Sequence, residues 1–66
     1  MIGERIKELR LEKGISQLTL GKAIGVSQKA VDYWERGVNE PKASYVVLLA
    51  DYFGVTADFL LGRKDT

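Results

Sequence analysis

Apolar residues recur at helical spacing in five short segments of the chain, and glycines or polar turns separate these segments. The spacing predicts helices over about residues 4–13, 17–24, 28–36 and 44–53, with a fifth beginning after Thr56. Gly3 is a candidate cap for the first helix. No alternating run is bounded by hairpin turns, so the fold class is predicted to be all-α.

Two of these helices begin in the same way. Ser16 and Ser27 are each followed by a glutamine and lie where an N-cap is expected, while Gly25 and Gly37 lie where those helices should end. Only a short turn containing Gly25 therefore separates the second helix from the third. This spacing is typical of a helix-turn-helix, in which the second helix enters the major groove of DNA.

Composition excludes several classes of site. The chain has no cysteine and no histidine, so we expect no disulfide, no metal site and no cofactor, and an enzyme is not predicted. No apolar run approaches the roughly 20 residues of a membrane span, and a cytoplasmic protein is expected, associated with the nucleoid if it binds DNA. The net charge of +1 says little by itself, so the positions of the charges matter more.

The third predicted helix has a continuous polar side. On a helical wheel this side collects Gln28, Lys29, Asp32, Tyr33 and Arg36, opposite an apolar side that includes Val31 and Trp34. A polar side of this kind is often only the solvated face of a surface helix. The preceding short turn favours the alternative, a helix that reads DNA.

A longer pattern runs through the chain. It consists of Ser16-Gln17, Leu20, Gly25-Val26-Ser27, Val31, Trp34-Glu35, Gly37, Pro41, Leu49-Ala50, Val55 and Asp58-Phe59-Leu60-Leu61-Gly62. With this pattern the sequence resembles the lambda-repressor-like family of Cro/C1-type (XRE) helix-turn-helix proteins. Gly21 departs from it, because the family usually has alanine there, and glycine costs up to about 1 kcal/mol of helix propensity.

The resemblance implies one compact five-helix DNA-binding domain over residues 1–66, with the helix-turn-helix at about 16–37 and a tail or linker start at 62–66. The implied function is a sequence-specific regulator of transcription from prokaryotes or phages, most often a repressor. Such a protein binds a pseudo-palindromic operator in double-stranded DNA as a homodimer. The alternative is a protein-interaction module, such as an antitoxin-like or anti-repressor partner, built on the same fold.

Candidate DNA contacts follow from side-chain chemistry and from the resemblance. Glutamine pairs with adenine, which suits Gln28. Lys29 suits either guanine or a phosphate, and Tyr33 suits either a thymine methyl group, through its ring, or a phosphate, through its hydroxyl. Asp32 either accepts a hydrogen bond from cytosine or restrains Lys29 or Arg36 along its helix. The predicted contacts to the DNA backbone are Ser16, Gln17, Lys22, Ser27, Arg36, Asn39 and Lys42. By resemblance, Gln17 also braces Gln28.

Two further sets of residues have structural roles. Arg10 lies on the apolar side of the first helix and needs an acidic partner, and the family pairs its position with that of Glu35. The fourth helix has a surplus apolar stripe beside the one expected in the core. This stripe is either partly covered by the fifth helix or belongs with that helix to a small twofold dimer interface. The residues of such an interface are Tyr45, Leu48, Tyr52, Thr56, Ala57 and Phe59.

Overall fold

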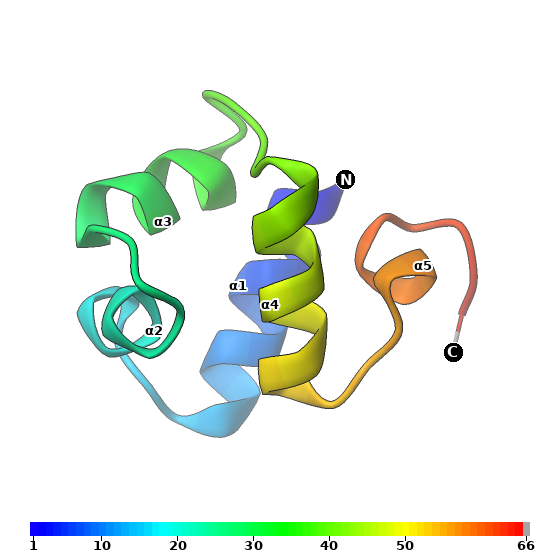
Figure 1. Cartoon of the computed structure of the whole chain (residues 1–66), viewed down its shortest axis with the longest axis horizontal. Coiled ribbons are helices and arrows are strands. Elements are labelled where there is room, and N and C mark those ends of the chain that lie inside the picture. Colours follow the sequence, from blue (N-terminus) through cyan, green and yellow to red (C-terminus); the bar gives the residue numbers. More distant parts are fainter. Residues whose placement is uncertain (66) are drawn as a thin grey trace.

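The described part of the chain folds into five helices around one core (Figure 1). The computed structural model describes residues 1–65, in which there is no β-strand, so the predicted all-α class is confirmed. Thr66, the last residue of the predicted tail, lies outside the described residues. The helices are α1 (Ile2–Lys13), α2 (Gln17–Ile24), α3 (Gln28–Arg36), α4 (Ala43–Phe53) and α5 (Ala57–Leu60).

Most helix ends lie where the capping residues predicted them. The hydroxyl of Ser16 accepts from the Thr19 N–H at 3.0 Å, and that of Ser27 accepts from the Ala30 N–H at 3.1 Å. Two starts differ from prediction. Helix α1 begins at Ile2, so Gly3 is inside the helix and is not its cap, and α4 begins one residue early, at Ala43.

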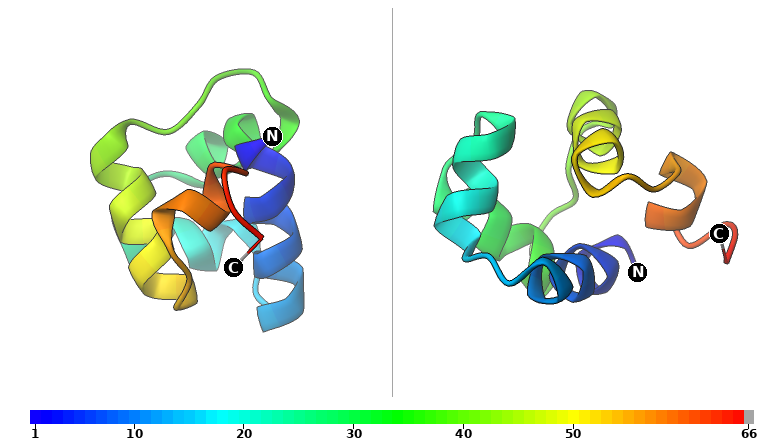
Figure 2. Two further views of the ribbon diagram at one scale, coloured as in Figure 1. Left: turned by 90° about the vertical axis from the view of Figure 1, so that its right-hand side faces the viewer. Right: turned by 90° about the horizontal axis from the view of Figure 1, so that it is seen from below.

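The core lies where α1, α2, α3 and α4 meet, and α5 closes it. Figures 1 and 2 show α5 on the opposite side of the molecule from α2 and α3, with α4 between them. Trp34 on α3 is buried, and the side chains with no significant exposure are Ile6, Leu20, Val31, Leu49 and Leu60. The core therefore contains residues from all five helices, and this packing sets the orientation of α2 and α3 relative to the other helices.

Two helical glycines permit close contact between backbones. A Cβ atom on Gly3 would overlap the carbonyl oxygen of Trp34, at the end of α3. A Cβ atom on Gly21 would lie 2.6 Å from the carbonyl oxygen of Val26, in the turn before α3. Gly21 thus departs from the usual alanine at a point where this turn leaves no room for a methyl group.

Candidate nucleic-acid interface

The α2–turn–α3 unit is set by its two N-caps and the glycine between its helices. Gly25 takes a left-handed conformation with φ of 84°, and its N–H donates to the Gly21 carbonyl at 2.8 Å. Ser27, two residues later, already caps α3. The first N–H groups of a helix have no partner within the helix, so α2 and α3 each offer such donors beside their serine caps.

The outward side of α3 is polar and carries two cations around one aromatic ring. Gln28, Lys29 and Arg36 are exposed, and Asp32 and Tyr33 are half-buried. The Lys29 ammonium lies 5.5 Å and the Arg36 guanidinium carbon 5.3 Å from the centre of the Tyr33 ring. Both distances suit cation–π contacts, so the three side chains form one surface along the helix.

The inner edge of α3 is tied to α1 by an ion pair. Arg10 Nε and Nη2 donate to the two carboxylate oxygens of Glu35 at 2.6 and 2.9 Å, and Arg10 Nη1 donates to the Ile15 carbonyl at 2.9 Å. The hydrogen bond with Glu35 raises the pKa of Arg10 above its ordinary value. The side chains of Arg10 and Glu35 are only 10% and 2% exposed, so the structure pairs the two residues as the sequence predicts.

Gln17, the first residue of α2, reaches across to α3. Its Nε2 donates to Asp32 Oδ1 at 3.2 Å and to Glu35 Oε1 at 3.1 Å. This differs from the predicted brace on Gln28, because in the free chain the amide group is held by two carboxylates instead. The predicted contact of the Gln17 side chain with the DNA backbone would have to compete with these two hydrogen bonds.

Asp32 binds both Gln17 and Arg36. Its second carboxylate oxygen accepts from Arg36 Nε at 2.9 Å, one helical turn away. The hydrogen bond from Gln17, together with the hydrogen bond and charge of Arg36, lowers the pKa of Asp32 below its ordinary value. Asp32 is therefore ionised at neutral pH, and of the two cations proposed for it, it holds Arg36.

The other predicted backbone contacts lie on exposed surface near α2 and α3. Lys22 is exposed on α2. Asn39 and Lys42 are exposed in the loop that leads from α3 to α4. Their exposure leaves all three accessible to a ligand.

Most residues predicted for a dimer interface contact other residues of the same chain. Tyr45 packs against Trp34 with ring centres 5.7 Å apart, and Tyr52 lies edge-on to Phe53 at 5.3 Å. The Phe59 ring lies 4.3 Å beneath the Arg5 guanidinium, and the Thr56 hydroxyl caps α5. Of the set, Leu48 is exposed and Ala57 lines a groove.

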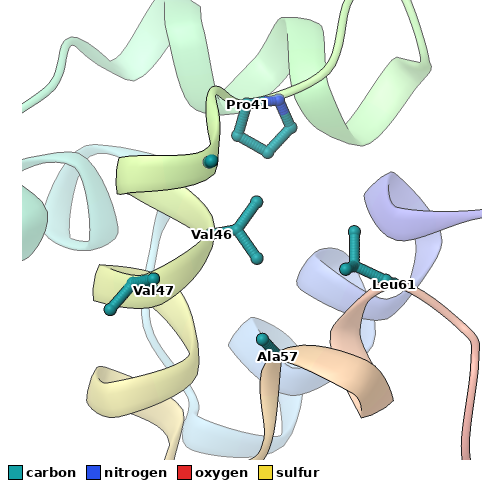
Figure 3. A pocket seen from close by; sticks show the side chains of 6 residues that line it. Pro41, Val46, Val47, Ala57 and Leu61 are labelled. Carbon is teal, nitrogen blue, oxygen red and sulfur yellow. The ribbon is translucent and has the colours of Figure 1, made fainter.

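That groove is apolar and lies between the start of α4 and α5. Figure 3 shows the Val46 side chain directed into the space between α4 and α5, with Pro41 above and Leu61 opposite. The groove has a volume of about 370 Å³, and Val47 and Leu61 at its edges are 54% and 46% exposed. Its lining residues are Pro41, Ala43, Val46, Val47, Ala57 and Leu61.

The apolar run at the start of α4 also points to this groove, through Val47, which the predicted dimer interface does not include. The run Val46-Val47-Leu48-Leu49 is apolar at every position, which is more than one buried helix face requires. Of the residues that line the groove, the predicted dimer interface includes only Ala57; it lacks Pro41, Ala43, Val46, Val47 and Leu61.

Within residues 1–65, no group of acidic side chains is placed to hold a metal ion. None of the helices there has the length and apolar character needed to cross a membrane.

A model of the helix-turn-helix family matches residues 6–60. The chain belongs to this helix-turn-helix family. It is 38% identical over 61 residues to the repressor protein C2 of Salmonella phage P22, an alignment covering 92% of this chain and 28% of that protein. It is 36% identical over 61 residues to the SPbeta prophage-derived HTH-type transcriptional regulator YonR of Bacillus subtilis, covering 92% and 56%. The chain thus spans less than two thirds of these relatives.

A solved structure has the same helix-turn-helix fold. The crystal structure of the P22 c2 repressor bound to a synthetic operator superposes with a TM-score of 0.91, at 36% identity over 97% of both chains. The predicted resemblance to Cro/C1-type proteins and the five-helix fold are confirmed. The family consists of transcription regulators and is not a family of enzymes.

Proposed function

We propose that this chain is a sequence-specific DNA-binding regulator of transcription, and that it acts as a repressor by occupying an operator. The observation that carries this proposal is its likeness, over nearly its whole length, to a repressor solved on operator DNA. The outward side of α3 is polar, and it lies beside the serine-capped starts of α2 and α3. Both features support the same function. Repression by any longer protein that contains this domain is part of the same proposal.

In the proposed complex α3 enters the major groove of DNA. Gln28 is at the N-terminal end of α3, where recognition helices reach base edges, and its amide suits adenine N6 and N7. Lys29 suits guanine O6 and N7, and the Tyr33 ring suits a thymine methyl group. The cation–π contacts hold Lys29 and Arg36 beside the Tyr33 ring before DNA binds.

Contacts to phosphates orient α3 in this proposal. Ser16 and Ser27 lie at helix N-termini, where main-chain N–H groups receive phosphate oxygens well. Asn39 and Lys42 in the following loop and Lys22 on α2 add side-chain donors. Such contacts fix the register of α3 but carry no sequence information directly.

We propose further that two chains bind one operator and meet through the apolar groove. The groove lies at the start of α4 and α5, and its edges expose Val47 and Leu61. An apolar surface on a domain of this size is better covered than left in water. A twofold pair would place two α3 helices in successive major grooves, about 34–36 Å apart.

Selection from a random library of double-stranded DNA tests this function. We expect a twofold-symmetric site to be enriched, with its half-sites about one helical turn apart. On that site, Gln28→Ala and Lys29→Ala should each cost about 1–3 kcal/mol of binding and relax the preference at one base pair. Asp51→Ala, on the exposed surface of α4, is the control and should leave the preferred sequence unchanged.

Three other outcomes of this selection separate the parts of the proposal. A single half-site, with one chain per duplex in sedimentation, would contradict the dimer and leave the reader of DNA intact. Binding without any preferred sequence, or no binding, would contradict sequence-specific recognition. The protein-interaction module would then become the better interpretation of the same fold.

A further inference from the structure

Asp32 is the acidic residue on the outward side of α3, and it holds two groups that could otherwise bind phosphates. One is the amide of Gln17 on α2, and the other is the guanidinium of Arg36 one helical turn along α3. The other acid of α3, Glu35, is buried in its pair with Arg10. Asp32 therefore differs from Glu35 in facing the proposed DNA surface, with its side chain 35% exposed.

The orientation of the Gln17 amide follows from its two acceptors. A glutamine amide has two N–H donors and one carbonyl oxygen, and an ionised carboxylate only accepts. Nε2 lies within 3.2 Å of Asp32 Oδ1 and 3.1 Å of Glu35 Oε1, so both donors are used. The reversed amide would place its oxygen against two carboxylates. Gln17 accordingly offers only its carbonyl oxygen to DNA, and an oxygen cannot donate to a phosphate.

The same carboxylate restrains Arg36. Its Nε is bound to Asp32 Oδ2 at 2.9 Å, and its guanidinium also lies over Tyr33. A phosphate that binds Arg36 must displace the carboxylate of Asp32 from its ion pair with this arginine. It must also approach the negative charge of Asp32, so this pair opposes phosphate contact at the end of α3.

We propose that Asp32 is a positioning residue that raises selectivity by withholding Arg36 and the Gln17 donors from the phosphate backbone. Binding to random DNA comes almost entirely from phosphate contacts. Withholding these donors therefore lowers the affinity for random DNA by the whole contribution of the lost contacts. On an operator, the same restraint leaves the Gln17 carbonyl oxygen as the free polar atom of this side chain, able to accept a hydrogen bond from the DNA-contacting surface. This inference rests on the proposed function and adds a device that separates operator from random DNA.

The test compares Asp32→Ala with Asp51→Ala, which removes the same charge from α4, on the selected operator and on a random duplex at several salt concentrations. One freed phosphate contact should steepen the slope of log affinity against log salt by about 0.9 and tighten binding to random DNA roughly 5- to 10-fold at about 0.1 M salt. The affinity for the operator should change by less than about threefold. The affinity gained from a new Arg36 phosphate contact is offset by the affinity lost when the Gln17 side chain is no longer restrained. The ratio of operator affinity to random-DNA affinity should therefore fall in Asp32→Ala. Asp51→Ala should leave the slope of log affinity against log salt unchanged.

A double variant identifies the freed group. Asp32→Ala combined with Arg36→Gln should return the salt slope to that of the unaltered chain, whereas a merely structural role of Asp32 predicts no change in slope at any stage. Asp32→Asn, which keeps the size of the side chain, is the second variant should the alanine variant melt early. The inference is overturned when Asp32→Ala matches Asp51→Ala on both duplexes, or when the double variant keeps the steeper slope. Loss of all binding by the unaltered chain would instead contradict the proposed function.

Discussion

Glu35→Gln should unfold at a much lower temperature than the unaltered chain. The substitution leaves the Arg10 guanidinium buried with no carboxylate, and breaking one side of a buried ion pair costs about 3–5 kcal/mol. A domain of this size has a total stability of only about 3–10 kcal/mol. Each kcal/mol lowers the melting temperature by about 4–8 °C in domains of this length, so we expect a fall of about 15–30 °C, measured by circular dichroism at 222 nm.

Two further variants separate the buried pair from a simple loss of charge. Glu40→Gln removes an equal charge from the exposed loop after α3 and should melt within a few degrees of the unaltered chain. Arg10→Met combined with Glu35→Leu removes both charges and should recover much of the lost stability, because apolar residues of similar volume replace buried pairs well. The account of this pair would be wrong if Glu35→Gln melted together with Glu40→Gln.

Gly3→Ala should destabilise the fold although alanine is the better helix former. Propensity alone predicts a gain of about 1 kcal/mol in the middle of a helix. The added methyl group would, however, meet the backbone of Trp34 and Glu35 at the end of α3, which is not free to rotate away as a side chain is. Forcing extra atoms into such a contact costs about 1–3 kcal/mol or more, so we expect a net loss in urea unfolding.

Glu8→Ala is the matched control for this prediction. It introduces the same residue into the same helix at an exposed position, where the effect should stay within about 0.5 kcal/mol. Equal or greater stability of Gly3→Ala would show that α1 and α3 do not approach as closely as the structure describes.

Local signals in the sequence were enough to predict most of this fold. Ser16 and Ser27 were predicted as N-caps because a short hydroxyl side chain satisfies a free N–H at a helix start, and both do so. Gly25 and Gly37 were predicted as ends because each can take positive φ. Features like these depend on residues a few positions apart, which a sequence shows directly.

Contacts between elements were harder to predict. The Arg10–Glu35 pair could be named only because a charge on an apolar face demands a partner and the family resemblance supplied one. Nothing local shows that Gln17 lies over Asp32, fifteen positions along the chain, so its brace was assigned to Gln28. Gly3 is a cap candidate from the sequence alone because glycine is common at helix starts. The backbone of α3 that excludes a side chain at Gly3 comes from a distant segment, which no local pattern shows.

The most direct test of the central claim is to titrate ¹⁵N-labelled protein with the selected operator duplex and with a scrambled duplex, and to follow each amide by NMR. The account predicts that the largest operator-dependent shifts occur at the starts of α2 and α3 and along residues 28–36, and that the scrambled duplex causes smaller shifts at the same amides. Unchanged α3 amides, with shifts confined to α1 or to the groove between α4 and α5, would contradict the claim that α3 reads DNA.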